Sequence, residues 1–225
     1  MSKSEQFRRI LTAYAMAMPE WMNDYRETGN MHHDPYVLDW RFESPIERNV
    51  WCEIRNMGLP FYPQIPARGY FIDFANPFLK IGIECDGKAW HDKERDRVRD
   101  ARLAEVGWMI FRIEGHECFR MVDLCTESDE EPTRDDVQRY YRETSAGVLR
   151  AIKWAYFEGG DEHDAEWLMR ATLFEHRSTP ETTIQPVERV QRNRGPVLIG
   201  DLMPEYLALL ERRMLRFKAL QAGFD

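Results

Sequence analysis

The sequence has no long apolar run, no signal-peptide pattern and no closely spaced pair of cysteines. A membrane-spanning helix needs about 20 consecutive, mostly apolar residues, and disulfides persist in oxidising compartments. These absences exclude a membrane-spanning protein and favour a cytoplasmic protein with reduced thiols. Cysteine occurs four times, far apart, at positions 52, 85, 118 and 125.

Zinc binding is another use of cysteine that the sequence disfavours. His116 precedes Cys118 and Cys125, but this spacing matches no standard zinc finger and a fourth ligand is not evident,. We therefore interpret the cysteines as buried or unreactive thiols.

The sequence also lacks positive charge overall, with 31 Lys and Arg against 39 Asp and Glu and a formal net charge of −8. This balance excludes a protein whose whole surface is basic for binding nucleic acid, but it does not exclude a local basic groove. Residues 127–136 form an acidic run typical of a solvated linker, whereas residues 88–102 and 189–218 carry more basic than acidic side chains,.

Apolar residues are numerous enough for a core: the 225-residue chain is 43% hydrophobic and 12% aromatic,. We find no internal repeat. We divide the chain into residues 1–43, an amphipathic helix and a connection; residues 44–124, a core; and residues 125–225, a helical C-terminal region.

The core has the pattern of a mixed sheet with helices. Ser44 as N-cap, Pro45 after it and Gly58 past the end predict a helix. The expected order is helix, three strands, helix, strand and helix, at residues 44–58, 61–86, 92–106, 107–113 and 116–124. Pro63 and Pro66 confine the first strand to a sheet edge, because proline has no N–H to donate.

After the acidic linker we expect helices alone. Residues 135–157 and 203–220 each keep an apolar stripe at helical spacing. The stripes are Val137, Tyr141, Val148, Ile152 and Tyr156, then Met203, Leu207, Leu210, Met214 and Phe217. They indicate core packing, contact with a protein partner, or self-association. The sequence thus predicts an α/β fold, a mixed central sheet flanked by helices, with an all-helical C-terminal extension.

Acidic residues interrupt the apolar strands of the core. Glu84 and Asp86 are two residues apart, so a strand projects both to one side, and Asp73 lies on the preceding strand, about 4.8 Å away. Carboxylates about 4 Å apart repel by about 4 kcal/mol at an effective dielectric constant near 20, so such a cluster needs protons or a cation. Mg²⁺ suits carboxylate ligands. The alternative is pairing with arginine, for which Arg68, Arg95 and Arg112 are available.

Four segments carry a family resemblance: "SPIE", "PQIPARGYFIDFANP", "IGIECDGKAWH" and "RDARLAEVGWMIFRI". They occur in this order, and with them the chain resembles the PD-(D/E)xK nuclease superfamily, in particular the branch of the DUF559 proteins and the very-short-patch repair endonucleases. The resemblance covers roughly a third of the chain. It implies a restriction-endonuclease-like core that hydrolyses DNA with Mg²⁺, for which Mn²⁺ can substitute.

The resemblance also implies roles for single residues. Metal would be held by Glu47, Asp73 and Glu84, although Glu47 could equally be the capping partner of Ser44. The catalytic candidates are Asp73, Glu84, Asp86, Lys88 and His91. The superfamily pattern places a lysine two residues after the glutamate, where this chain has Asp86, as DUF559 sequences do. Either Lys88 takes over or no lysine does. Gln64 is expected to orient the site.

The segment after Asp86 supplies candidates for nucleic-acid contacts: Lys88, Trp90, Lys93, Arg95 and Arg99. Basic side chains contact phosphates without selecting sequence. Trp90 could stack on bases or pack beneath the next helix.

Two functions follow. The first is a metal-dependent DNA endonuclease or nickase of DNA repair, restriction or mobile-element defence, in which metal activates water and His91 moves a proton. The second is a catalytically inactive nuclease fold that binds nucleic acid or protein. The missing lysine and the net negative charge favour the second, and the several separate acids favour the first. An RNA nuclease is a third alternative.

Overall fold

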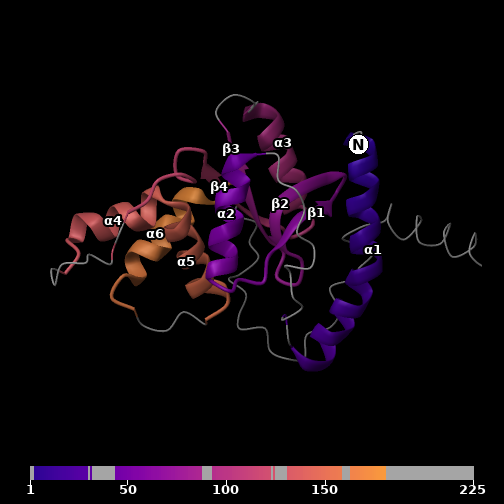
Figure 1. The fold of residues 1–225 in the computed structure, drawn as a ribbon, viewed down its shortest axis with the longest axis horizontal. Coiled ribbons are helices and arrows are strands. Elements are labelled where there is room, and N and C mark those ends of the chain that lie inside the picture. Colours follow the sequence, from indigo (N-terminus) through magenta and orange to yellow (C-terminus); the bar gives the residue numbers. More distant parts are fainter. Residues whose placement is uncertain are drawn as a thin grey trace, which may run out of the picture.

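The computed structural model describes residues 3–29, 31, 44–87, 93–122, 124, 131–158 and 163–180 of the chain (Figure 1). Its elements are α1 (Lys3–Thr28), α2 (Pro45–Asn56), β1 (Tyr62–Ala67), β2 (Tyr70–Asn76), β3 (Ile81–Asp86), α3 (Lys93–Ala104), β4 (Met109–Glu114), α4 (Arg134–Glu143), α5 (Ser145–Tyr156) and α6 (Glu166–His176). The predicted N-terminal helix, the helices near residues 44–58 and 92–106, and all four predicted strands are confirmed.

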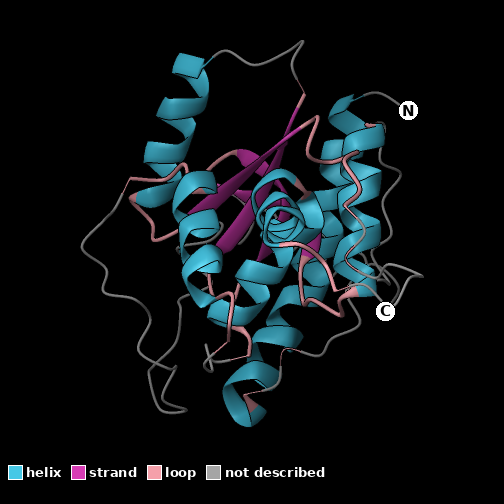
Figure 2. Cartoon of the chain, turned by 90° about the vertical axis from the view of Figure 1, so that its left-hand side faces the viewer, coloured by secondary structure: helices cyan, strands magenta, loops and turns pink. Residues whose placement is uncertain are grey.

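The four strands form one mixed sheet in the order β1-β2-β3-β4. The first two pairings are antiparallel, and β3 pairs with β4 in parallel through the crossover helix α3. Because β1 is at the edge, the restriction expected from Pro63 and Pro66 is confirmed,. Figure 2 shows the strands enclosed by helices, so the predicted α/β fold with a helix-flanked mixed sheet is confirmed.

Each face of the sheet has its own apolar core. On one face α1 packs on β1 and β2, with Ile10, Tyr14 and Met18 buried as their spacing predicts,. On the other face α2 and α5 pack on β2, β3 and β4. Fully burying an aliphatic or aromatic side chain contributes about 1.5–3 kcal/mol. Both faces of the sheet are therefore held by helices from distant parts of the chain.

The alternation of side chains breaks at one place, in β1 and β2 together. Ile72 and Ala75 belong to the α1 core, whereas Phe74 between them packs with α2. Strict alternation would put Ile72 and Phe74 on the same face. Opposite this irregularity, Gln64 has a positive φ of 54°, a conformation that is strained for a residue with a side chain. Asp73 and Gln64 therefore lie at the place where the β1–β2 hairpin departs from regular strand geometry.

The helical region after the linker joins the sheet instead of standing apart. Val148, Leu149 and Ile152 of α5 share a core with β3 and β4. After α6, Arg177 forms an isolated antiparallel bridge with Phe111 of β4. The Ser178 N–H donates to the Ile110 carbonyl at 2.9 Å, and the Ile110 N–H donates to the Thr179 hydroxyl at 3.2 Å. The described parts of the extension, residues 131–158 and 163–180, contain the helices α4, α5 and α6 as predicted, and residues 203–220 lie outside the described residues.

The helix predicted at residues 116–124 is wrong. Residues 115–119 form turns, and no helix occurs among residues 115–122 and 124. The Glu117 carboxylate accepts the Glu114 N–H at 2.7 Å and contacts His176 of α6 at 3.0 Å. Glu117 therefore stabilises the turn and holds α6 against it. Cys118, in the same turn, is buried.

Residues 135–157 are helical, but not as one continuous stripe. Thr144 ends α4 and begins α5, and its hydroxyl accepts the Gly147 N–H at 3.0 Å. Threonine is a good N-cap because its side chain satisfies an otherwise unpaired N–H.

Among the helices in the described ranges, none is long and apolar enough to cross a membrane.

We predict that Gly147→Ala destabilises the protein. A Cβ at Gly147 would lie 2.0 Å from the Tyr140 carbonyl oxygen, so α4 and α5 would have to separate. Helix propensity alone favours alanine by about 1 kcal/mol, but the clash should lower the free energy of unfolding by about 3 kcal/mol. Urea denaturation measures the change, with Ala146→Ser as the neighbouring control. Equal stability of Gly147→Ala and wild type would contradict this packing.

Candidate active site

Asp73 and Glu84 lie on adjacent strands. The β2–β3 register pairs Phe74 with Ile83, and one further step sets Asp73 opposite Glu84. The Asp73 carboxylate accepts the Cys85 N–H at 2.9 Å and the Gln64 amide at 3.3 Å. Burial raises the pKa of Asp73, although these hydrogen bonds and the charge of Arg99 oppose the increase,. The two carboxylates are thus brought together as the sequence predicts.

Glu84 is only 4% exposed. Its pKa is well above the ordinary value, first because of burial and second because of the charge of Asp73,. Arg99 Nη2 lies 2.7 Å from Glu84 Oε2. Among the described residues, Glu84 Oε1 has no hydrogen-bond partner although it is buried. One oxygen of this carboxylate is therefore paired with a cation, and the other is buried without a hydrogen-bond partner among the described residues.

Gln64 links the hairpin to α2. Its amide Nε2 lies 3.4 Å from Glu47 Oε2 and 3.3 Å from Asp73 Oδ1. The Ser44 hydroxyl makes no cap hydrogen bond to α2, so the reciprocal capping box is wrong and Glu47 faces the site instead. The expected orienting role of Gln64 agrees with these contacts, since one side chain holds two of the acids in place.

Arg112 of β4 joins α3 to the end of β3. Its guanidinium binds Asp100 at 2.9 and 3.0 Å and Asp86 at 2.7 Å. Asp100 is 3% exposed, and bidentate arginine–carboxylate pairs are strong and directional. Asp86 therefore pairs with arginine, which is the alternative that the sequence left open, and its predicted catalytic role stays a prediction.

The REase_MTES_1575 family of restriction-endonuclease-like domains matches residues 46–128. An uncharacterized protein of Haemophilus influenzae is 30% identical over 91 residues, which are 38% of this chain and 75% of that protein. The chain belongs to the REase_MTES_1575 family. The predicted resemblance to nucleases is thereby confirmed at the level of a nuclease-fold family.

Other relatives of this REase_MTES_1575 member cover less of it. An uncharacterized protein of Mycobacterium tuberculosis is 33% identical over 85 residues, which are 33% of this chain and 31% of that protein. The solved catalytic domain of the homing endonuclease I-Bth0305I is 23% identical with a TM-score of 0.29, over 33% of this chain and 80% of that domain.

Several predicted residues of this family member fall outside the described structure. Lys88, Trp90 and His91 lie outside the described residues, as does the side chain of Lys93. Arg95 is exposed on α3, as a phosphate contact requires. The side chain of Arg99 is 19% exposed and lies against Glu84, and its predicted contact with nucleic acid stays a prediction.

The chemistry of the donor set fits a hard divalent cation. Buried carboxylates with raised pKa values and an unpartnered oxygen, Glu84 Oε1, are what a cation would neutralise,. The described residues nevertheless contain no group of three or more His, Cys, Asp and Glu placed to hold a metal ion. Asp73 and Glu84 would therefore be the two principal ligands, with Glu47 held farther out through Gln64.

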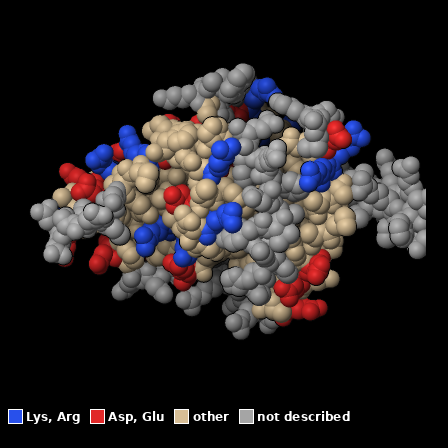
Figure 3. All heavy atoms as spheres, viewed as in Figure 1, with Lys and Arg blue, Asp and Glu red and all other residues tan. Residues whose placement is uncertain are grey.

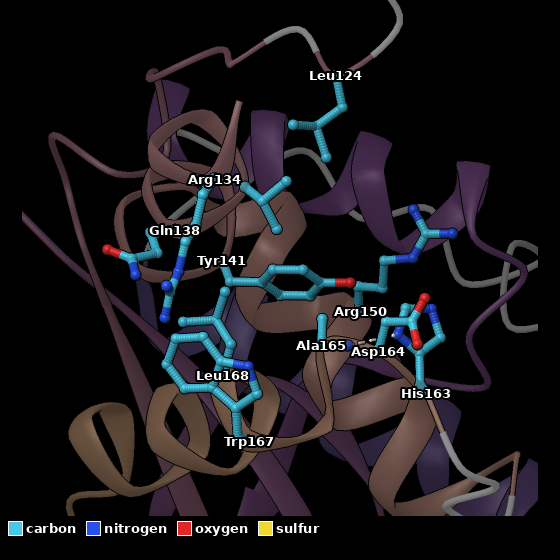
Figure 4. A pocket seen from close by; sticks show the side chains of 11 residues that line it. Leu124, Arg134, Gln138, Tyr141, Arg150, His163, Asp164, Ala165, Trp167 and Leu168 are labelled. Atoms are coloured by element: carbon cyan, nitrogen blue, oxygen red, sulfur yellow. Dashed lines mark hydrogen bonds between the residues drawn. The ribbon is translucent and has the colours of Figure 1, made fainter. Parts of the chain in front are cut away.

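A cavity of about 500 Å³ lies away from these carboxylates, in the helical region. It is formed by α4, α5 and the start of α6, and Figure 4 shows Tyr141 and Trp167 among its lining side chains. Arg134 stacks on the Trp167 ring at 5.8 Å. The predicted site residues do not line this cavity, so it is separate from the candidate active site.

Charge is mixed over the face of the molecule drawn in Figure 3, where basic and acidic side chains are interspersed. This pattern agrees with the net charge of −8. A net negative charge disfavours contact with a polyanion over the whole surface,.

Sequence reasoning missed two contributors to the site, Arg99 as the partner of Glu84 and the Arg112–Asp100 pair. The signal for the second was present, since a charged residue inside the apolar strand of residues 109–114 requires a partner. The first has no such signal, because arginines recur along α3.

We predict that Arg112→Met lowers the free energy of unfolding by about 3–5 kcal/mol, because the buried Asp100 carboxylate loses both of its hydrogen bonds from Arg112,. Arg97→Met is the control. Arg97 pairs with Glu94, but both side chains are exposed, and such pairs contribute about 0–1 kcal/mol. Chemical denaturation compares the two variants, and similar losses would contradict a clamping role for Arg112.

A second prediction concerns pH. Since burial raises the pKa of Asp73 and Glu84, the folded protein holds these protons more tightly than the unfolded chain does. Stability should then fall as the pH rises from the ordinary carboxyl pKa through the raised values. Asp73→Asn removes one such group, so its stability relative to wild type should rise between pH 4.5 and pH 8. Thermal melts in EDTA test this, and a pH-independent difference would refute it.

Proposed function

We propose that this protein is a metal-dependent DNA endonuclease or nickase. The observation that carries the proposal is the buried pair Asp73 and Glu84, with raised pKa values and one unpartnered oxygen. Membership of a restriction-endonuclease-like family supports hydrolysis of phosphodiester bonds. Perturbed carboxylates are common at functional sites because catalysis requires such environments.

Asp73 and Glu84 would hold Mg²⁺, or Mn²⁺ in its place. The metal would supply Lewis-acid polarisation of a phosphate oxygen and a lowered pKa for bound water. Gln64 fixes the Asp73 carboxylate through its amide at 3.3 Å, and the Cys85 N–H fixes the other oxygen at 2.9 Å. With both oxygens held, the carboxylate needs little reorganisation when it meets a cation.

The reaction is a hydrolysis. The oxygen of a water molecule bonds to phosphorus and the bond to the leaving sugar oxygen breaks, while the proton released by water is balanced by protonation of that leaving oxygen. The proton transfer needs a side chain that can gain and lose a proton near neutral pH. Histidine is such a residue, and His91 is the candidate. Lys88, Trp90, Lys93 and Arg95 are proposed as DNA contacts.

A catalytically inactive binding module is the second candidate function. The ion pairs Arg99–Glu84 at 2.7 Å and Arg112–Asp86 at 2.7 Å favour it, because they neutralise two acids without a metal. The open oxygen of Glu84 favours the first candidate.

Cleavage of supercoiled plasmid tests the proposal. Wild-type protein with Mg²⁺ or Mn²⁺ should nick or linearise the DNA, and EDTA should abolish this. Asp73→Asn and Glu84→Gln should each lose at least about 10²-fold in rate, because each would remove a metal ligand. Glu175→Gln, an exposed acid on α6, is the control and should retain the wild-type rate.

Metal binding supplies a readout that does not depend on the substrate. A divalent cation that binds the folded state alone raises Tm by mass action. Mn²⁺ should therefore stabilise wild type and not Asp73→Asn. Cleavage that persists in both acid variants would refute the nuclease proposal, and DNA binding indifferent to metal and to Asp73 would support the binding module.

A further inference from the structure

β3 provides no cation beside Glu84. Two residues after Glu84 stands Asp86, and its carboxylate is engaged by Arg112 at 2.7 Å. Cleaving a phosphodiester adds negative charge to a phosphate that already carries it, next to two buried carboxylates. A cation fixed within the site would offset this charge.

The crossover helix α3 supplies such a cation, Arg99, which contacts Glu84 of β3. Arg99 Nη2 reaches Glu84 Oε2 at 2.7 Å, and the two side chains are largely buried. Among the described residues, Arg99 Nε is buried and without a hydrogen-bond partner. Asp100 Oδ1 lies 3.8 Å from Arg99 Nε, beyond hydrogen-bonding range,. The Nε–H group of this guanidinium is therefore not satisfied by any described residue.

The position of Arg99 is fixed by its neighbour in sequence. Asp100 is held by Arg112 through two hydrogen bonds of 2.9 and 3.0 Å, and Asp96 lies 3.9 Å from the same guanidinium. This anchors α3 over the carboxyl end of β3. A residue beside such a buried bidentate pair has little freedom to move away.

We propose that Arg99 is the catalytic cation of this site, reaching the reacting phosphate from α3 where the superfamily pattern has a lysine on the strand. The proposal rests on the proposed nuclease function. Arg99 forms and breaks no bond. It keeps its contact with Glu84 Oε2 and its positive charge offsets the charge that develops on the phosphate, while Glu84 Oε1, buried without a partner among the described residues, would be the oxygen available to the metal.

The two open atoms argue against a merely structural ion pair. A buried pair that serves stability alone would satisfy the remaining donors and acceptors, because each unpaired buried group costs about 1–3 kcal/mol. Here an unsatisfied acceptor on Glu84 and an unsatisfied donor on Arg99 flank one contact. That arrangement suits a cation and an anion arriving together, which is the composition of a metal–phosphate complex.

The test uses full-length Arg99→Met and Arg99→Lys, with Arg142→Met as the control, an exposed arginine paired with Glu175. Metal-dependent plasmid nicking gives kcat and KM, and the electron paramagnetic resonance signal of free Mn²⁺ gives the affinity for metal. We expect Arg99→Met to lose about 10²–10³-fold in kcat, the size typical of a lost charge-stabilising donor. KM and Mn²⁺ affinity should change less than about threefold, and Arg99→Lys should recover at least about tenfold of the lost rate.

Two results would overturn the inference. One is an unchanged kcat in Arg99→Met. The other is a parallel loss of Mn²⁺ affinity and kcat, which would assign Arg99 to structural support of Glu84. If Arg99→Met fails to fold, Arg99→Lys decides, because a lysine that keeps Mn²⁺ affinity without any of the rate would refute a catalytic cation. Wild type that neither binds Mn²⁺ nor cleaves would instead refute the proposed function.

Discussion

A single guanidinium on β4 sets the geometry around the carboxylates. Arg112 engages Asp100 on α3 and Asp86 at the end of β3, so it fixes the crossover helix against the strand that precedes it. A parallel pair of strands alone does not determine where its crossover helix ends. With α3 held in this way, Arg99 falls on Glu84 and the apolar side of α3 covers the sheet. The position of Arg99 beside Glu84 therefore depends on the contacts of Arg112 with Asp100 and Asp86.

A second constraint acts inside the hairpin of β1 and β2. The positive φ of Gln64 costs about 1–3 kcal/mol as strained backbone, and the alternation of side chains breaks at Asp73 on the opposite strand. In return, the Asp73 side chain takes the Cys85 N–H and the amide of Gln64. The apolar pairs on either side of the distortion, Ile65 with Ile72 and Pro63 with Phe74, keep the register. One of the three described non-glycine residues with positive φ, Gln64, thus lies opposite the acid, and the other two are Arg68 and Lys80.

Most of the fold could be predicted because its signals are local. Ser44, Pro45 and Gly58 mark the bounds of α2, and an acid inside an apolar strand is conspicuous at Glu84. The helix expected at residues 116–124 and the continuous helix expected at residues 135–157 could not be predicted correctly, because they depend on contacts that the local sequence does not show. Glu117 has the character of a helical residue, but its carboxylate is used by α6, and Thr144 caps a helix in a run that is otherwise continuous. Only the placement of α3 distinguishes Arg99 from the exposed Arg95 and Arg97.

Both edge strands of the sheet carry features that disfavour pairing with another strand. β1 carries two prolines, and Tyr14 of α1 donates its hydroxyl to the Pro63 carbonyl. At the other edge, Ser178 and Thr179 occupy the Ile110 carbonyl and N–H. An open edge would invite a strand from a second chain. Among the described residues, these features disfavour assembly by continuation of the sheet at either edge, which favours keeping the strand ends that carry the carboxylates free of a neighbouring sheet.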